Sequence, residues 1–149
     1  MYHYRYEDRW KRGEGNQKVV NRIEVVAAII EIDKKFLITR RKSESHLGDF
    51  WEFPGGKKEN EEDLESCLIR EMREELGIEV RVNGEILSLD YDYPDRTVAL
   101  HFFRCDWKGG DLRAEGCQEF KWVEKTGLND HEFPPANVSI LTFLKNQKS

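Results

Sequence analysis

The stretch Gly56–Ile78, which reads GKKENEEDLESCLIREMREELGI, decides the fold prediction for this chain. Its apolar side chains recur every four residues, at Leu64, Leu68, Met72 and Leu76. This spacing indicates an α-helix with one buried face. Asn60 is the expected N-cap of that helix, and Gly77 is its expected C-terminal stop. The acidic residues 61–63 would then lie at the positive end of the helix dipole.

Acidic side chains fall on the buried side of this predicted helix. At about 100° per residue, Glu71 and Glu75 share the side of the apolar stripe. Glu74 borders that side, whereas Arg70 points away from it. Carboxylates near the C-terminus of a helix oppose its dipole, and their inward placement adds a desolvation cost. A bound divalent cation would offset both, and carboxylate oxygens suit Mg²⁺, with Mn²⁺ as the alternative.

A solvated helix face is the other common reason for a run of charged residues. That interpretation does not explain why these carboxylates are on the apolar side. Glu62 is a different case, because it precedes Glu71 by nine residues and is about half a turn out of phase with it. Helix geometry alone therefore gives Glu62 no role.

The composition limits the class of protein. The chain has 149 residues, enough for one domain with a real core, and a formal net charge of −5, which argues against a nucleic acid polymer as partner. A small phosphorylated substrate stays compatible with that charge if metal ions screen the acids. We see no apolar run that would span a membrane and no signal-peptide core, so a cytoplasmic protein is expected. The three cysteines, Cys67, Cys105 and Cys117, lack metal-site spacing and are expected to be reduced thiols.

The order of predicted elements mixes strands and helices in one domain. Residues 1–20 show no clean period and are interpreted as a flexible N-terminal extension, followed by a domain over 21–149. Strands are expected at 22–32, 36–41, 50–53, 80–93, 97–107 and 120–123, with a short helix at 138–145. Turns are expected at Asp33-Lys34, Pro94-Asp95 and Gly109-Gly110.

The motif stretch resembles, position for position, the signature of the Nudix hydrolases, which cleave nucleoside diphosphates linked to another group. The resemblance implies an α/β fold, the Nudix α/β/α sandwich, with a mixed β-sheet between helices. It implies that Glu71, Glu74 and Glu75 hold Mg²⁺ and that the carbonyl of Gly55 is a further ligand. It also marks Arg70 as the residue that orients the motif, and it alone marks Glu62 as catalytic.

Further segments are similar to the MutT branch of this family, the 8-oxo-dGTP diphosphatases. They include Trp51-Glu52-Phe53-Pro54-Gly55-Gly56-Lys57 and Phe133-Pro134-Pro135-Ala136-Asn137. The likeness implies substrate-binding roles for Arg41, His46, Phe53, Asp95, Arg96 and Asn137, with Arg41 at the phosphates. It also implies a metal-site glutamate on a later loop, for which Glu115 is the first candidate. The spacing from Glu115 to Trp122 is one residue longer than in that branch, so Glu119 is the second candidate.

The chemistry of an amide gives Asn137 independent support. Guanine presents O6 and N7 as adjacent acceptors, and oxidation at C8 turns N7 into a donor. An Asn side chain offers one donor and one acceptor, so it pairs with both positions only in the oxidised base. A rigid loop that enters the last helix, with Asn137 as its N-cap, is the structural alternative.

The resemblance therefore implies a monomeric, Mg²⁺-dependent pyrophosphohydrolase that converts 8-oxo-dGTP into 8-oxo-dGMP and pyrophosphate, which removes oxidised guanine from the nucleotide pool and serves DNA repair. Two alternatives stay open. A Nudix pyrophosphohydrolase for CTP and 5-methyl-dCTP is one, because the stretch 23–30 resembles that subfamily as much as the MutT branch. The other is a non-catalytic nucleotide-binding module, which the complete set of motif carboxylates disfavours.

Overall fold

A mixed four-stranded sheet organises the molecule in the computed structural model, which describes residues 21–45 and 47–148. Its strand order is β5-β1-β7-β6, from β1 (Asn21–Ile29), β5 (Gly55–Lys57), β6 (Ile78–Tyr93) and β7 (Arg96–Gly110). β1 runs parallel to β7, whereas the other neighbouring pairs are antiparallel. The predicted extension over 1–20 lies outside the described residues.

A second, smaller sheet is built on β3 (Lys35–Arg40). β3 pairs with β2 (Glu31–Ile32), β4 (Trp51–Glu52) and β8 (Glu119–Glu124), in each case antiparallel. The Asp33-Lys34 turn was predicted correctly, and both of its residues have positive φ, 53° and 64°. The expected strand over 22–32 is instead divided at Ile30, where the chain passes from the first sheet into the second.

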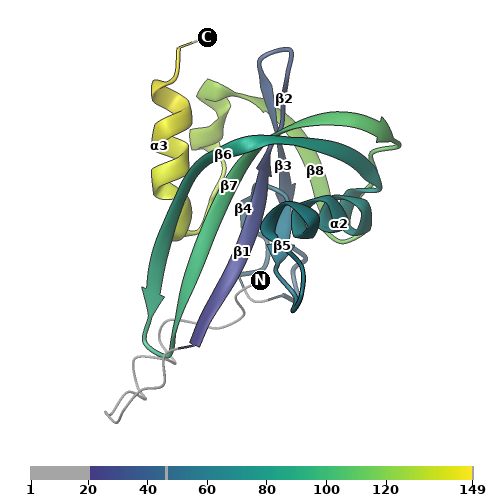
Figure 1. Ribbon diagram of the computed structural model, residues 1–149. Coiled ribbons are helices and arrows are strands. Elements are labelled where there is room, and N and C mark those ends of the chain that lie inside the picture. Colours follow the sequence, from purple (N-terminus) through teal and green to yellow (C-terminus); the bar gives the residue numbers. More distant parts are fainter. Residues whose placement is uncertain (1–20, 46, 149) are drawn as a thin grey trace.

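The helices lie on opposite faces of the first sheet (Figure 1). α2 (Leu64–Leu76) packs on one face through Leu68, Met72 and Leu76, which form a buried cluster with Val26 and Ala28 of β1. α3 (Val138–Asn146) and the second sheet cover the other face, where Ile140 and Leu144 join Val25, Ala27 and Ile29 of β1. The predicted mixed sheet between helices is therefore confirmed.

The ends of α2 correct one prediction and confirm another. The N-cap is Asp63, whose Oδ1 accepts a hydrogen bond from the Ser66 N–H at 2.8 Å, so Asn60 is not the cap. Glu61 has a φ of 71°, a left-handed conformation that keeps the residues before Asp63 out of the helix. Gly77 ends α2 as expected, with a φ of 71° and its N–H bonded to the Arg73 carbonyl.

The later elements follow the predicted order with shifted bounds. β6 and β7 are longer than expected, and Gly109-Gly110 ends β7 instead of forming a separate turn. Two 3-10 helices, Lys125–Asp130 and Pro135–Asn137, lead into α3. Within the part of the chain that the structure describes, every helix is too short or too polar to cross a membrane.

All three cysteines are free and buried inside this framework. Burial raises the pKa of each thiol, at Cys67, Cys105 and Cys117, to about 12. Thiols of this kind stay protonated at neutral pH and are poor nucleophiles.

Candidate active site

Arg70 gathers the acidic side chains of the motif around its guanidinium. Its Nε and Nη2 donate to both carboxylate oxygens of Glu62, at 2.9 and 2.6 Å. Its Nη1 donates to Glu71 at 3.2 Å and to Glu74 at 3.1 Å. Helix periodicity, which placed Arg70 off the apolar stripe, did not predict these contacts. The backbone position does lie off the apolar stripe, but the long side chain reaches back along the helix to the carboxylates.

Glu62 is fixed by this contact although it precedes the helix. Hydrogen bonds from Arg70, and then one from the Glu59 N–H, lower the pKa of Glu62 to about 2. Glu62 thus stays ionised and ties the loop before α2 to the middle of the helix. The structure gives this residue the geometric context that helix periodicity could not supply.

Glu75 is the buried acid of the cluster. It is only 9% exposed, and its Oε1 accepts a hydrogen bond from the Gly55 N–H at 3.1 Å. Burial raises the pKa of Glu75 well above its ordinary value, and repulsion from Glu52 adds to the rise. The carboxylate is therefore held in place in a setting that disfavours its charge.

Glu71 lies against Gly56 at the start of the motif. A β-carbon at residue 56 would come within 2.2 Å of the Glu71 carboxyl carbon, so a side chain there would displace this carboxylate from its position. Partial burial, and then repulsion from Glu74, raise the pKa of Glu71. Glu74 differs from both neighbours, because its side chain is 61% exposed.

The carboxylates of α2 line a cavity of about 520 Å³. Its acidic lining residues are Glu52, Glu59, Glu71, Glu74 and Glu75, and its basic ones are Arg41, Lys42 and Lys57. Ser45, Gly55, Gly56, Gly116 and Cys117 complete the lining. Acids and bases that share one cavity of this size suit a substrate with phosphate groups and an accompanying cation.

Arg41 and Glu52 form a buried ion pair at this cavity. Arg41 Nη1 lies 3.5 Å from Glu52 Oε2, and the two side chains are 6% and 9% exposed. Gln118 holds the chain at the same point, because its Nε2 donates to the Arg41 carbonyl at 3.2 Å and to Asp49 Oδ1 at 2.9 Å. The backbone that carries Arg41 is thus tied to the start of β8.

A second, smaller cavity adjoins the first. It has a volume of about 20 Å³ and is lined mainly by apolar side chains, including those of Val25, Phe53 and Phe102. Asn137 also lines it, is 4% exposed, and makes no side-chain capping bond to α3. Asn137 therefore occupies the N-cap position of α3 without acting as a side-chain cap.

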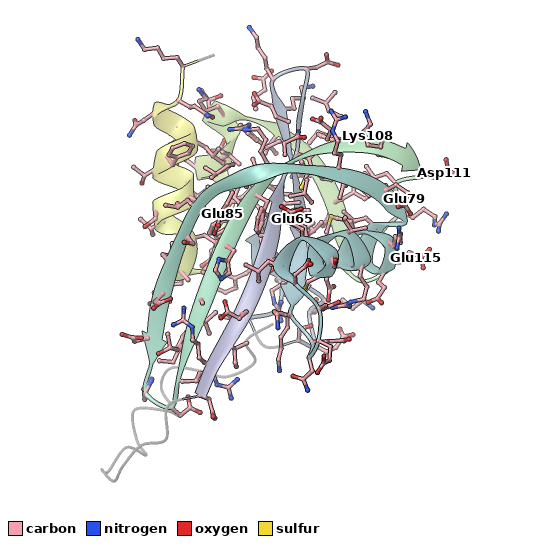
Figure 2. All side chains as sticks on the ribbon, in the orientation of Figure 1. Glu65, Glu79, Glu85, Lys108, Asp111 and Glu115 are labelled. Atoms are coloured by element: carbon pink, nitrogen blue, oxygen red, sulfur yellow. The ribbon has the colours of Figure 1, made fainter. Side chains whose placement is uncertain are left out.

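The predicted later-loop glutamates are not cavity-lining residues in this structure. Glu115 Oε2 accepts a hydrogen bond from Arg113 Nε at 2.9 Å, and Figure 2 shows Glu115 near the end of α2 that leads into β6. Its backbone N–H bonds to the Glu75 carbonyl at 3.0 Å. Glu119 pairs with Arg40 at 3.0 Å on the second sheet. Glu115 thus reaches the site through its backbone, and Glu119 does not line the cavity.

The remaining predicted substrate residues are spread more widely. Phe53 lines the smaller cavity, as noted above. Asp95 and Arg96 lie where β6 turns into β7, with Arg96 Nε 3.8 Å from Asp95 Oδ1. Neither residue lines either cavity. His46 lies outside the described residues.

Sequence reasoning missed Glu52 as a site residue. Its signal was a single acid between Trp51 and Phe53, in a short segment that is otherwise apolar. Such a residue is either at an edge or in a functional site, because an acid buried in an apolar strand carries a large desolvation cost. Lys42, Ser45 and Gln118 gave no comparable signal, because each lies in a polar segment.

The residues present fit a divalent cation in donor chemistry. Carboxylate and backbone carbonyl oxygens are the ligands that Mg²⁺ prefers. Within residues 21–45 and 47–148, no three acidic, histidine or cysteine side chains already converge on one point. The reason is visible in the contacts, because Arg70 engages Glu71 and Glu74 whereas Gly55 engages Glu75. Glu71 and Glu75 still offer carboxylates whose charge burial disfavours, which a cation would relieve.

Comparison with known proteins agrees with this geometry. The chain matches the NUDIX domain over residues 25–143. It is 35% identical to the 8-oxo-dGTP diphosphatase of Escherichia coli K12 over 128 residues, which are 85% of this chain and 98% of that protein. It is 38% identical to the CTP pyrophosphohydrolase of the same strain over 119 residues, 80% of this chain and 88% of that protein.

A solved structure from work on MutT of Aliivibrio salmonicida and Vibrio cholerae aligns with a TM-score of 0.71 and 30% identity. That alignment covers 85% of this chain and 98% of the other. Members of the Nudix family generally use a divalent metal. Because the domain match spans most of the chain and the relatives align over nearly all of their own length, this chain belongs to the Nudix family and is a Nudix hydrolase.

Proposed function

We propose that this protein is a MutT-type pyrophosphohydrolase that uses Mg²⁺ to convert 8-oxo-dGTP into 8-oxo-dGMP and pyrophosphate. It would remove oxidised guanine nucleotides from the cytoplasmic pool and act as a monomer. The relative in Escherichia coli that bears the name 8-oxo-dGTP diphosphatase supports the substrate class. The single observation that carries the proposal is the setting of Asn137.

Asn137 has the burial and the surroundings of a base-reading residue. Its amide lines an apolar cavity, and its side chain does not serve the helix that follows. An amide that faces a cavity and does not cap a helix can donate to and accept from a ligand there. One donor and one acceptor side by side match O6 and N7–H of 8-oxoguanine, but not the two acceptors of guanine.

The base cavity must open to receive a purine. Its volume of about 20 Å³ is close to the space that a single water needs. The Phe53 ring packs at 5.4 Å from the ring of Phe133, which belongs to the segment before α3. Movement of this segment would enlarge the cavity and leave Asn137 at its edge. We therefore expect the base to displace the segment 131–137 when it binds.

The carboxylate side of the larger cavity is the proposed reaction centre. Glu71, Glu74, Glu75 and the Gly55 carbonyl would hold Mg²⁺, with Glu115 as a further ligand if its side chain leaves Arg113. Bound Mg²⁺ neutralises phosphate charge and lowers the pKa of a coordinated water. Glu75, with its raised pKa and fixed position, is suited to accept the proton of the attacking water.

The basic side of the cavity would bind the phosphates. Arg41 presents its guanidinium there, and charge-assisted hydrogen bonds from arginine to phosphate are among the stronger polar contacts. Lys42 and Lys57 line the same cavity and add positive charge. These groups would stabilise the charge that develops on the leaving pyrophosphate.

A cytosine nucleotide is the second candidate substrate. The 38% identity with the CTP pyrophosphohydrolase of Escherichia coli is the observation that favours it. Initial rates with 8-oxo-dGTP, dGTP, CTP and 5-methyl-dCTP, measured as pyrophosphate release, separate the two. A preference for the cytosine nucleotides would reject the 8-oxo-dGTP assignment.

The sharper test is Asn137→Ala. We expect kcat/KM for 8-oxo-dGTP to fall about 5- to 150-fold, from the loss of about 1–3 kcal/mol of paired hydrogen bonding. dGTP should lose far less, so the selectivity ratio should shrink. Asn146→Ala is the matched control, because it makes the same substitution at an exposed position near the end of α3. Equal losses for both nucleotides would show that Asn137 does not read the base.

A further inference from the structure

Glu52 lines both cavities. With Gly55, it is a lining residue common to the 520 Å³ cavity and the 20 Å³ cavity. Gly55 contributes only backbone there, so Glu52 supplies the shared side chain. On the proposed function, which this inference extends, the two cavities hold the phosphates and the base. Glu52 therefore stands between the two ends of the bound nucleotide.

The position of Glu52 is fixed by the second sheet. β4 pairs with β3 so that Glu52 is in register with Thr39, and the Thr39 hydroxyl donates to the Glu52 carbonyl at 3.5 Å. The next residue of β3, Arg40, pairs with Trp51 in the same antiparallel ladder. Arg41 follows at the end of β3, and its N–H bonds to the Phe50 carbonyl at 2.9 Å. The two backbones thus bring Arg41 and Glu52 together before any ligand binds.

The charge of Glu52 is hard to explain by stability alone. Burial raises the pKa of its carboxyl, Arg41 only partly opposes that, and the buried Glu75 repels it. Buried ion pairs of this kind are often no more stabilising than apolar side chains of similar volume. An ion pair that adds little to folding and lines a substrate cavity is better explained by a role in orienting the arginine.

We infer that Glu52 is a positioning residue that holds the Arg41 guanidinium between the phosphate and base cavities. Their 3.5 Å contact fixes the direction of the guanidinium, which lines the larger cavity where the phosphates would lie. Without Glu52, Arg41 would be drawn toward other carboxylates of the same cavity. Glu52 would thereby set where the phosphates lie relative to the base, without contacting the reacting atoms.

A double-mutant cycle tests this inference. The proteins are wild type, Arg41→Lys, Glu52→Gln and the double variant, each assayed for kcat/KM with 8-oxo-dGTP. We expect each single variant to lose about 10- to 100-fold, the size of effect that misplacement of a reacting group produces. The kcat/KM of the double variant should be no more than about threefold below that of the less active single variant, because both changes remove the same contact. Losses that multiply would show that Glu52 acts independently of Arg41 and would overturn the inference.

A second measurement separates positioning from a structural role. The melting temperature of Glu52→Gln should fall, because the buried Arg41 charge loses its partner. All assays are therefore run well below the melting temperature of every variant, and unchanged kcat/KM in the folded Glu52→Gln protein would make Glu52 a structural residue. Glu79→Gln is the matched control, since Glu79 pairs with Arg73 at 2.7 Å on the exposed side of α2 and should leave both measurements unchanged.

Binding of inorganic triphosphate distinguishes a failed inference from a failed function. Calorimetric titration of the four proteins with this probe needs no turnover and no base. We expect Arg41→Lys and Glu52→Gln to weaken its binding by similar factors, again without multiplication in the double variant. If wild type hydrolyses none of the nucleotides but the binding cycle shows this coupling, the proposed function falls and the role of Glu52 stands. Unchanged binding in Glu52→Gln would refute the role of Glu52 itself.

Discussion

Replacing Glu75 by Gln should have opposite effects on activity and on stability. The amide keeps the size of the side chain and an acceptor for the Gly55 N–H, so the change removes mainly the charge. We expect kcat to fall by at least about 10²-fold, the lower range for loss of a general base or a key electrostatic group. KM should change much less, because Arg41 and the base cavity are untouched.

The stability effect follows from the burial of Glu75. A carboxylate removed from water costs several kcal/mol even after the protein relaxes, and a charge-assisted hydrogen bond returns only about 1.5–3 kcal/mol. The Gln variant keeps about 1 kcal/mol of that bond and loses the desolvation cost. In the presence of a chelator we therefore expect a net gain of about 1–3 kcal/mol, or a rise in Tm of about 2–12 °C for a chain of this size.

The pH dependence of that gain gives an internal check. A carboxyl whose folded pKa is raised contributes stability below its unfolded pKa, and that contribution is lost as pH rises through the folded pKa. The Tm difference between Glu75→Gln and wild type should therefore be near zero at about pH 4 and grow toward neutral pH. Thermal scans in chelator at several pH values measure it, and Mg²⁺ should then raise Tm more for wild type than for the variant.

Two outcomes would refute this reasoning. A variant with kcat within a few-fold of wild type would place the chemistry on another residue. A Tm below wild type in chelator at neutral pH would mean that the ionised Glu75 stabilises the fold. Glu79→Gln is again the control, because its exposed pair with Arg73 is screened by solvent and should change Tm little at any pH.

Three other predictions concern the metal, the N-terminus and the Arg70 cluster. Excess chelator should abolish pyrophosphate release but leave the far-ultraviolet circular dichroism spectrum unchanged, because the core of α2 is apolar; undiminished turnover would reject a metal-dependent reaction. Deleting residues 1–18 should shift Tm by only a few degrees, because the buried part of β1 begins at Val25, and a large drop would contradict this. Because Arg70 holds the pKa of Glu62 at about 2, the stability from their contact is present above the ordinary value of 4.5 and lost as pH falls toward 2. Glu62→Gln should therefore flatten the decline of Tm over that acid range, and an unchanged decline would show that the contact does not contribute.

The local features of the motif helix were predictable from sequence. The four-residue spacing of Leu68, Met72 and Leu76 determined the buried face, and Gly77 supplied the left-handed residue that ends α2. The N-cap was harder, because Asn60 and Asp63 are both good capping residues. The choice depended on the left-handed turn at Glu61, which a sequence pattern does not reveal.

The carboxylate cluster shows where periodicity stops being informative. A helical wheel gives the direction of each β-carbon, and this correctly placed Glu75 on the buried side. It does not give the end point of a long side chain such as Arg70, whose guanidinium lies several bonds away. The contact with Glu62 also needs the loop before α2 to fold back, which is a tertiary feature.

The Arg41–Glu52 pair could not be predicted from the sequence, for a related reason. The two residues are brought together by the register of β3 with β4, across the polar loop between them. Only the order of elements, not their register, could be predicted from the sequence. Glu115 illustrates the same limit, because the motif likeness pointed to its side chain whereas the structure uses its backbone N–H to bond the Glu75 carbonyl.

The contacts of Arg70 bear on how the site would accept a cation. Its guanidinium satisfies one oxygen each of Glu71 and Glu74, while both oxygens of Glu62 are engaged. A carboxylate has two oxygens, so Glu71 and Glu74 each retain one that is not used by this contact. Arg70 therefore neutralises part of the charge and keeps the carboxylates oriented, whereas Glu62 holds Arg70 itself. Loss of Glu62 should free the guanidinium to compete with a cation for Glu71, which gives this residue a role in the site even though it lies outside the helix.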